Sequence, residues 1–229
     1  KNMLQKIKRL FAANNALSKT ERHKPIHSSS DVGDFYNQYN DKFLQVYGDV
    51  IQAFRSHDVS VLLDYQINSM QLKKGMKVLD AGCGVCGPAL YFAKKTGVEI
   101  HAVTISSKQY QKAKENIEKE GLQDKVFLYH GDYHHLEDVV KQNDFDVVYF
   151  LESLGHSPEH SQAINSAWKV LKQGGLLYVK DLFRREPLLP EHRPKIEREI
   201  KKINDAYRYN IADMYEVLQY LRMKGWIIS

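Results

Sequence analysis

The chain alternates apolar, strand-like segments with segments of helical spacing from Lys77 onward. Parallel strands need crossover connections of a dozen or more residues, and a strand that is apolar along its whole length is covered on both faces. The sequence therefore predicts an α/β fold in which a doubly wound, mostly parallel sheet carries helices on both faces. Strands are expected at residues 77–82, 98–106, 125–133, 145–153 and 175–183, and the helices between them at 88–95, 108–119, 137–141 and 160–171.

The first 70 residues have a different character. Residues 1–30 contain seven Lys or Arg side chains and one acidic residue, Glu21, so the rest of a chain with net charge +5 is close to neutral. Aromatic residues then recur at helical spacing, namely Phe35, Tyr36, Tyr39, Phe43 and Tyr47. A basic arm and a helical cap at 1–70 are therefore predicted ahead of a core at 71–229, and the cap can fold over a ligand as a lid.

Composition excludes several classes of protein. No apolar run approaches the roughly 20 residues that cross a membrane, and no cleavable leader is visible. Two cysteines in 229 residues cannot build a disulfide framework. We therefore expect a cytoplasmic protein without stable membrane insertion. Helical spacing also occurs at 50–70, 194–204 and 211–224, and residues 225–229 have the apolar character of a strand that is cut off at its start.

The glycine-rich segment VLDAGCGVCGPAL, residues 78–90, allows two interpretations. Cys83 and Cys86 have the C-x-x-C spacing of a redox or metal pair, but residues 82–87 also form a G-x-G-x-x-G turn, which is typical of nucleotide binding. A ligand of a doubly wound sheet lies over the carboxyl ends of its strands. A dinucleotide site would need an acidic residue at the end of the second strand, where this chain has Thr104, so a different nucleotide is favoured.

The strand ends together resemble the class I S-adenosylmethionine-dependent methyltransferases. The motifs are DAGCG at 80–84, AVTIS at 102–106, GDY at 131–133 and FLES at 150–153. VTIS followed by Gln109 is most similar to the sterol, cyclopropane-fatty-acid and isoprenoid-diphosphate C-methyltransferases. The resemblance implies a Rossmann-like core, S-adenosyl-L-methionine as cofactor, and the following cofactor contacts: Asp80, Gly82, Cys83, Gly84, Thr104, Ser106, Gln109, Asp132 and Tyr133.

Physical roles can be assigned to several of these positions. Gly82 and Gly84 leave room for the cofactor where a side chain would collide with it. Asp80 can accept a hydrogen bond from the cofactor's ammonium group. In the family, the residue at the position of Asp132 accepts from the adenine amino group, and Tyr133 can pack on the ring.

The fourth strand supplies the predicted catalytic residues. FLESLGH places Glu152 at the strand end, where the methyl group must be delivered, and His156 four residues later. If an alkene is methylated, a carbocation forms, and a carboxylate beside it can stabilise the charge and then take a proton. The resemblance supports this role, since these C-methyltransferases commonly have a Glu here. The alternative is that Glu152 orients the methionine part of the cofactor and His156 caps the next helix.

The predicted acceptor is a carbon of an alkene in an isoprenoid, either a prenyl diphosphate or a related lipid. Aromatic faces stabilise a developing cation, so Phe35, Tyr36 and Tyr39 are predicted to bind the substrate. A carboxylate and a histidine could equally deprotonate a hydroxyl or orient an amine. An O- or N-methyltransferase of a small natural product or metabolite is therefore the alternative, and a binding module without turnover is a further one.

Metal and partner expectations follow from the same motifs. A diphosphate-bearing acceptor would bring Mg²⁺, held mainly by phosphates and waters. No protein metal site is predicted, because His130, His134 and His135 lack companions that complete one. The residues after the fourth strand lack the motifs of nucleic-acid methyltransferases, so we expect a small-molecule substrate and no nucleic acid. The family's fold ends in an antiparallel strand pair that this chain is expected to lack, so an open sheet edge could be covered by a second copy in a homo-oligomer.

Overall fold

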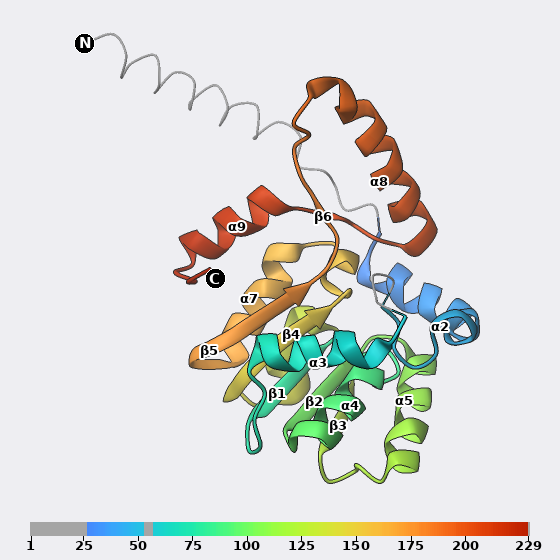
Figure 1. Cartoon of the computed structure of the whole chain (residues 1–229), viewed down its shortest axis with the longest axis vertical. Coiled ribbons are helices and arrows are strands. Elements are labelled where there is room, and N and C mark those ends of the chain that lie inside the picture. The colour runs from blue at the N-terminus through green and yellow to red at the C-terminus, as the bar shows by residue number, and fades with distance from the viewer. Residues whose placement is uncertain (1–26, 53–56, 229) are drawn as a thin grey trace.

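A five-stranded parallel sheet forms the centre of the molecule (Figure 1). The structure is a computed structural model that describes residues 27–52 and 57–228. The strands are β1 (Lys77–Ala81), β2 (Glu99–Thr104), β3 (Val126–His130), β4 (Phe145–Leu151) and β5 (Leu171–Lys180), and their order in the sheet is β3-β2-β1-β4-β5. Every neighbouring pair is parallel, which confirms the predicted α/β class. The strand order reverses between β1 and β4, which is where doubly wound sheets bind ligands.

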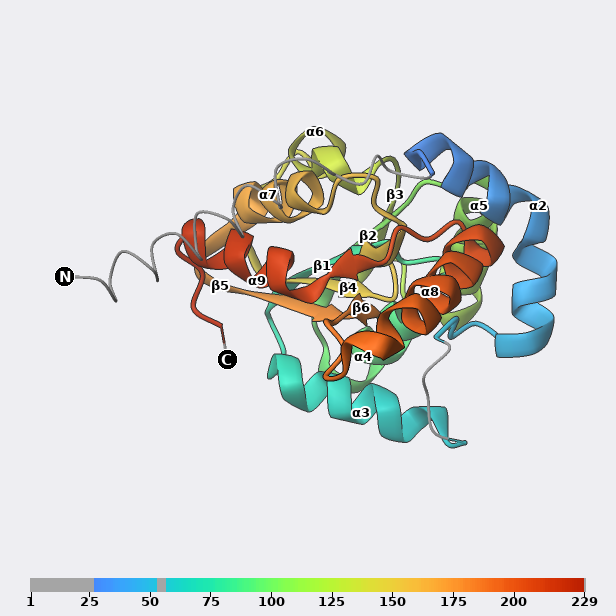
Figure 2. The same ribbon diagram turned by 90° about the horizontal axis from the view of Figure 1, so that it is seen from above.

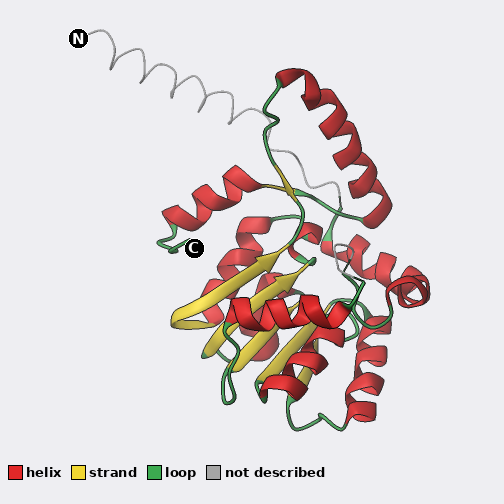
Figure 3. Ribbon diagram, in the orientation of Figure 1, coloured by secondary structure: helices red, strands yellow, loops and turns green. Residues whose placement is uncertain are grey.

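Helices cover both faces of the sheet, as Figures 2 and 3 show. One hydrophobic core joins one face to the helices α3 (Val59–Met70), α4 (Gly87–Thr96) and α5 (Ser107–Glu120). A second core joins the other face to α6 (Leu136–Val140), α7 (His160–Val170) and α9 (Met214–Met223). Burying one large apolar side chain stabilises a fold by about 1.5–3 kcal/mol, so these two layers fix the sheet as a rigid base for its loops.

The aromatic segment forms the helix α2 (Ser29–Tyr47), as its spacing predicts. Ser28 and Asp31 make a capping box at its start, and Gly48 ends it with a φ of 65°. The helix packs against α5 beside the carboxyl end of the sheet. Asn37 makes this contact, because its Oδ1 accepts hydrogen bonds from the Ser106 hydroxyl at 2.8 Å and from the backbone N–H of Lys108 at 3.1 Å. The position suits the predicted lid.

A long excursion leaves the sheet after β5. It runs through β6 (Phe183–Arg184) to α8 (Arg193–Tyr207), which lies beyond the carboxyl end of the sheet (Figure 1), and it returns through β7 (Ala212–Asp213). β6 and β7 pair with each other and close the base of the excursion. Tyr209 and Asn210, which lie between α8 and β7, are buried. They bring the returning chain onto the turn that follows β4, since the backbone N–H of Asn210 donates to Gly155 O at 2.6 Å.

Two details differ from the sequence-based expectation. The helix expected at 50–70 begins only at Val59, where Asp58 caps it; residues 50–52 are not helical and 53–56 lie outside the described residues. Residues 225–228 are not a strand. The backbone N–H of Trp226 donates to Leu221 O, and its ring lies 4.7 Å from that of Trp168 on α7, so this end packs on a helix rather than pairing with the sheet.

Residues 1–26, which carry all seven basic side chains of the predicted arm, lie outside the described residues. The division into a cap at 1–70 and a core at 71–229 stays a prediction, and α3 packs in the same hydrophobic core as β1. In the part of the chain that the structure describes, no helix is both long and apolar enough to cross a membrane.

Candidate active site

A pocket lies at the carboxyl ends of β1, β2 and β4, and it encloses about 720 Å³ of space that is continuous with solvent. Its walls combine strand ends with residues from α2 and from the segment after α2. The lining residues are Val32, Tyr36, Asp49, Ile51, Gln52, Asp80, Gly82, Cys83, Gly84, Val85, Pro88, Thr104, Ile105, Gln109, Tyr133, Leu151, Glu152, Ser153 and His156.

The glycine-rich turn after β1 forms one wall of this pocket. Gly82 has a φ of 106°, and a Cβ there would lie 2.4 Å from the Cβ of Ser153, so only glycine fits. The next wall is the segment 49–52, which lies directly on the start of α4. A Cβ on Gly87 would lie 2.0 Å from Asp49 O. The Ser153 side chain and the Asp49 backbone thus confine the turn from two sides. The remaining space beside the turn is a narrow cradle for a ligand.

Asp80 ends β1 inside the pocket and is 2% exposed. Burial raises the pKa of its carboxyl to about 7, although a hydrogen bond from the Tyr149 hydroxyl at 2.9 Å opposes the shift. A buried carboxylate of this kind is stabilised by a cation, since a cation restores the charged form. The site therefore fits a ligand that brings an ammonium group.

The predicted contacts after β2 divide into two groups. Thr104 and Gln109 line the pocket, and the Thr104 hydroxyl donates to Gln109 Oε1 at 3.3 Å. Ser106 is not part of the lining. Its hydroxyl caps α5 by accepting from the backbone N–H of Gln109 at 3.1 Å, and it donates to Asn37. Ser106 thus holds α5 and α2 in place beside the pocket.

The predicted contacts after β3 divide in the same way. Tyr133 lines the pocket, and its hydroxyl donates to Ser153 O at 3.0 Å. Asp132 is not part of the lining. It accepts from the backbone N–H of His134 at 3.0 Å and pairs with the ring of His134. Burial would raise the pKa of Asp132, but these hydrogen bonds lower it to about 2.

Glu152 follows β4 in a left-handed conformation, with a φ of 54°. Such strain in a residue other than glycine often marks a functional site. Its side chain is 8% exposed, lines the pocket, and forms an ion pair with Lys180 at the end of β5. The Tyr209 hydroxyl donates to the backbone oxygen of Glu152 at 3.0 Å. Lys180 thus holds the carboxylate at the pocket wall, and Tyr209 holds the backbone of the same residue.

His156 lines the pocket at the end of the short turn Leu154–His156, before the loop to α7. Its Nδ1 faces Arg208 O at 3.1 Å, so this nitrogen carries the proton. The Nε2 atom then accepts from the Tyr36 hydroxyl at 2.9 Å. Burial lowers the pKa of His156 to about 4, so the ring is neutral at neutral pH.

The three predicted aromatic substrate contacts do not have equal positions. Tyr36 lines the pocket, whereas Phe35 and Tyr39 do not. They pack beside it on α2, with ring centres 5.4 Å apart for Phe35 and Tyr36 and 5.1 Å apart for Phe35 and Tyr39. The Arg208 guanidinium lies 5.9 Å from the Phe35 ring. Phe35 thus packs against Tyr36, and Tyr39 packs against Phe35.

Sequence reasoning missed several residues that the structure brings to the site. Asp49, Ile51 and Gln52 line the pocket, and Lys180 holds Glu152. No motif identifies them, because each lies far along the chain from the residue it serves. Asp181, the next residue after Lys180, is half-buried, and desolvation of its carboxyl raises its pKa to about 7. Its carboxylate accepts from the backbone N–H of Gly155 at 2.8 Å and so holds the turn that carries His156.

The cysteine pair does not have the character of a redox site. Cys83 and Cys86 are both free and buried, and burial raises the pKa of the Cys83 thiol well above its usual range. A buried thiol with a raised pKa is a poor nucleophile. Among the described residues, no group of three or more His, Cys, Asp or Glu side chains is placed to hold a metal ion.

The sheet order, the glycine turn after β1 and the pocket over the strand ends are those of the class I S-adenosylmethionine-dependent methyltransferase fold. The chain belongs to the mycolic acid cyclopropane synthetase family, which matches residues 18–206. S-adenosylmethionine is the cofactor of this family. The buried Asp80 and the cradle at Gly82 fit such a cofactor.

Two curated relatives show the range within the family. The chain is 30% identical to the methyltransferase GfsG of Streptomyces halstedii over 170 residues, which are 70% of this chain and 60% of GfsG. It is 38% identical to the sterol 24-C-methyltransferase ERG6B of Gibberella zeae over 115 residues, or 50% of this chain and 30% of ERG6B. The chain therefore spans less than two thirds of the length of these relatives.

Two solved structures share the fold. The [4+2]-cyclase SpnF has a TM-score of 0.71 and 26% identity, over 87% of this chain and 72% of SpnF. A geranyl diphosphate methyltransferase in complex with GPP and sinefungin has a TM-score of 0.70 and 15% identity, over 85% of this chain and 79% of the other. The second likeness shows the fold alone.

Proposed function

We propose that this protein transfers a methyl group from S-adenosylmethionine to a carbon of an alkene in an isoprenoid or related lipid. The observation that carries the proposal is the position of Glu152. Its carboxylate lines the same pocket as the glycine turn, and the rings of Tyr36 and Tyr133 line that pocket too. A carboxylate and aromatic faces are the groups that stabilise a carbocation. The sterol 24-C-methyltransferase relative supports transfer to carbon.

Different residues of the pocket serve different steps of the proposed reaction. S-adenosylmethionine, once bound, would supply an electrophilic methyl group to the alkene carbon and would leave as a thioether. The neighbouring carbon of the acceptor then carries the positive charge. Glu152 stabilises that charge and takes a proton from the adjacent carbon, which restores a double bond. Tyr36, held by His156, keeps an aromatic face at the same wall.

We assign cofactor binding to the pocket residues at the ends of β1, β2 and β3. Asp80 accepts from the ammonium group, while Gly82, Cys83 and Gly84 give room to the methionine part and the ribose. Thr104 and Gln109 hold the ribose hydroxyls, and Tyr133 packs on the adenine. These roles stay predictions, and so do direct contacts from Ser106 and Asp132, which the structure uses as helix caps.

Gln52 joins this proposed set. It is 1% exposed and lines the pocket, and its Nε2 atom has no hydrogen-bond partner among the described residues. A buried donor without a partner is costly unless a ligand satisfies it. The carboxylate of the cofactor's methionine part supplies such an acceptor.

The charges of the lining favour an uncharged acceptor. Among the described residues of the wall, the charged side chains are Asp49, Asp80 and Glu152, all acidic, and Lys180 nearby is paired with Glu152. A diphosphate would add like charge to this wall. A neutral lipid is therefore the acceptor that we favour over a prenyl diphosphate. Mg²⁺ depends on a diphosphate and is not part of the proposal.

Transfer to oxygen or nitrogen of a small natural product is the second candidate. It is favoured by the pair of Tyr36 and His156, since a neutral His156 could take a proton from an acceptor hydroxyl through Tyr36. A cytoplasmic location and self-association are predictions that stay open to test.

The experiment is incubation with methyl-labelled S-adenosylmethionine and a panel of acceptors. The panel contains sterols, prenyl alcohols, unsaturated acyl lipids, prenyl diphosphates, phenols and amines, and products are identified by mass spectrometry and NMR. We expect label on carbon of an uncharged lipid. Label only on oxygen or nitrogen would favour the second candidate, and cofactor binding without transfer to any acceptor would indicate a binding module or another reaction on this fold.

A further inference from the structure

Lys180 ends β5 and lies beside the end of β4, where Glu152 lines the pocket. In the sheet register it is opposite Leu151, and the backbone N–H of Glu152 donates to Lys180 O at 2.7 Å. Glu152 then turns back through its left-handed φ, and its carboxylate pairs with the Lys180 ammonium. The pair is poorly exposed, with 22% of the Lys180 side chain and 8% of the Glu152 side chain accessible. A buried carboxylate that lost such a partner would be strongly destabilised.

The same ammonium group also fixes the amide of Gln52. Lys180 Nζ donates to Gln52 Oε1 at 3.1 Å, and Gln66 Nε2 donates to the same oxygen at 2.8 Å. An ammonium can only donate, so the amide oxygen must face it and the amide NH₂ must point away. The NH₂ group of Gln52 is the one without a partner, on a side chain that lines the pocket. Lys180 thus orients one acceptor and one donor toward the ligand.

We propose that Lys180 is a positioning residue, which holds the Glu152 carboxylate at the acceptor side of the pocket and turns the Gln52 amide toward the cofactor. The proposal rests on the proposed function, because Glu152 acts there as the base. Lys180 also links the segment that lies over the glycine turn to the Glu152 carboxylate. Gln52 belongs to the segment 49–52 that lies on Gly87, so this segment and Glu152 are held by one side chain.

Two separable effects follow from the loss of the ammonium group. In Lys180→Met the Glu152 carboxylate loses its ion pair with Lys180 and shifts from its position, which slows turnover. The Gln52 oxygen loses one of the two donors that orient the amide, which weakens cofactor binding. A role that is only structural would lower the free energy of unfolding without separating these two effects. Lys180→Arg keeps the charge and donors, and it should restore part of both.

The test compares Lys180→Met, Glu152→Gln, Gln52→Leu and the double variant Lys180→Met with Glu152→Gln. Lys172→Met is the matched control, because Lys172 belongs to the same strand and pairs with Asp146 at the far end of the sheet. Steady-state kinetics give kcat and the acceptor KM, and calorimetry gives the Kd of S-adenosylmethionine. All variants are checked for unchanged secondary structure.

We expect kcat to fall about 100-fold in Lys180→Met, which is within the range for a displaced general base. The acceptor KM should stay within about threefold, since uniform binding is not removed. The double variant should be no slower than Glu152→Gln, because residues that act as a unit are not additive. The Kd should rise in Lys180→Met and rise further in Gln52→Leu, because Gln66 still donates to the Gln52 oxygen in the first variant. Lys172→Met should match the wild type.

A double variant that multiplies the two losses would overturn the proposal, and so would equal losses in Lys172→Met. If the wild type binds cofactor but methylates no acceptor, the proposed function fails. The calorimetric arm still decides the role of Lys180 in that case. An unchanged Kd in Lys180→Met would then reject it.

Discussion

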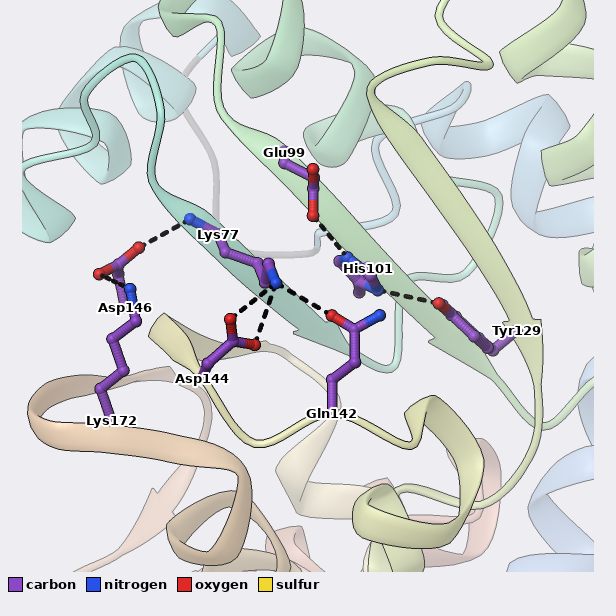
Figure 4. Close-up of polar contacts among 8 residues, drawn as sticks. All are labelled: Lys77, Glu99, His101, Tyr129, Gln142, Asp144, Asp146 and Lys172. Atoms are coloured by element: carbon purple, nitrogen blue, oxygen red, sulfur yellow. Dashed lines mark hydrogen bonds and ion pairs between the residues drawn. The ribbon is translucent and has the colours of Figure 1, made fainter.

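The two ends of the sheet hold their carboxylates in opposite ways. At the amino end, Lys77 pairs with Asp144, and Asp146 accepts from Lys172 and from the backbone of Lys77 (Figure 4). The hydrogen bond from Lys77 lowers the pKa of Asp144. Burial would raise the pKa of Asp146, but Lys172 and the Lys77 backbone lower it on balance. These carboxylates are neutralised within the fold.

At the carboxyl end, burial raises the pKa of Asp80 to about 7 and does the same for Asp181. Two of the buried histidines, His101 and His156, show the same contrast. His101 is held by Tyr129 and Glu99 from the strands themselves, whereas His156 is held by Tyr36 from α2 and by the loop at Arg208. The polar groups at the amino end are paired without a ligand. Those at the carboxyl end depend on α2 and on the loop at Arg208, and their carboxylates leave negative charge that a ligand can neutralise. The difference teaches that similar side-chain pairs stabilise the sheet at one end and build a site at the other.

The largest expected effect separates two glutamates. Glu152→Gln should lower kcat by about 100-fold or more, because the isosteric amide can neither take a proton nor stabilise a cation equally well. Cofactor affinity should stay close to that of the wild type. Glu99→Gln at the other end is the control and should keep its turnover. Equal turnover in both variants, measured by transfer of labelled methyl, would remove Glu152 from the mechanism.

The next contrast uses two glycines of positive φ. Gly121 ends α5 with a φ of 66°, and a Cβ added there would meet no atom within 4 Å, so Gly121→Ala introduces only backbone strain, about 1–2 kcal/mol. Gly82→Ala adds a collision with Ser153 and closes the cradle. Urea unfolding should show the larger loss for Gly82→Ala, and calorimetry should show loss of cofactor binding in that variant alone. Normal cofactor affinity in Gly82→Ala would place the cofactor elsewhere.

Cofactor binding should depend on pH through Asp80. The pKa of this carboxyl, raised to about 7, means that it is protonated below neutrality, whereas the ammonium of the cofactor binds the ionised form. As pH falls below 7, the Kd should rise by up to about tenfold per unit, because a proton must first be lost. Asp80→Asn should remove this dependence, and Asp181→Asn should keep it. Calorimetry between pH 5.5 and pH 8 checks the slope, and a Kd that is constant in the wild type contradicts the role of Asp80.

The smallest contrast concerns the two tyrosines bound to histidines. Tyr36→Phe and Tyr129→Phe each leave a histidine nitrogen without its hydroxyl partner, at a cost in unfolding free energy of about 1–3 kcal/mol. We expect turnover to fall severalfold only in Tyr36→Phe, because Tyr36 lines the pocket and Tyr129 does not. If Tyr129→Phe slows methyl transfer as much, the two ends are not functionally distinct.

The sequence predicts most of the fold because its signals are local. Apolar runs separated by segments of helical spacing mark every strand of the sheet. The strand expected at 225–229 was wrong, since a strand needs a neighbour and apolar character does not reveal one. Ser106 and Asp132 stand directly before helical turns, and this position is itself a capping signal.

The rest of the site could not be predicted, because it depends on contacts between distant segments. Lys180 meets Glu152 across two strands, and Asp49 meets Gly87 through a segment with no motif. Tyr36 is recognisable as part of an aromatic stripe, but which member of the stripe faces the pocket depends on how α2 packs on α5. Spacing gives the face of a helix and not its partner.

Hydrogen exchange with and without S-adenosylmethionine tests the division between the two ends most directly, since it reports where the ligand stabilises the backbone. Slower exchange is predicted for residues 80–87, 104–109 and 152–156, which contain the residues of the pocket wall. Residues 142–146 at the amino end should exchange at an unchanged rate. Protection centred on 142–146, or no protection of 80–87, would contradict the account.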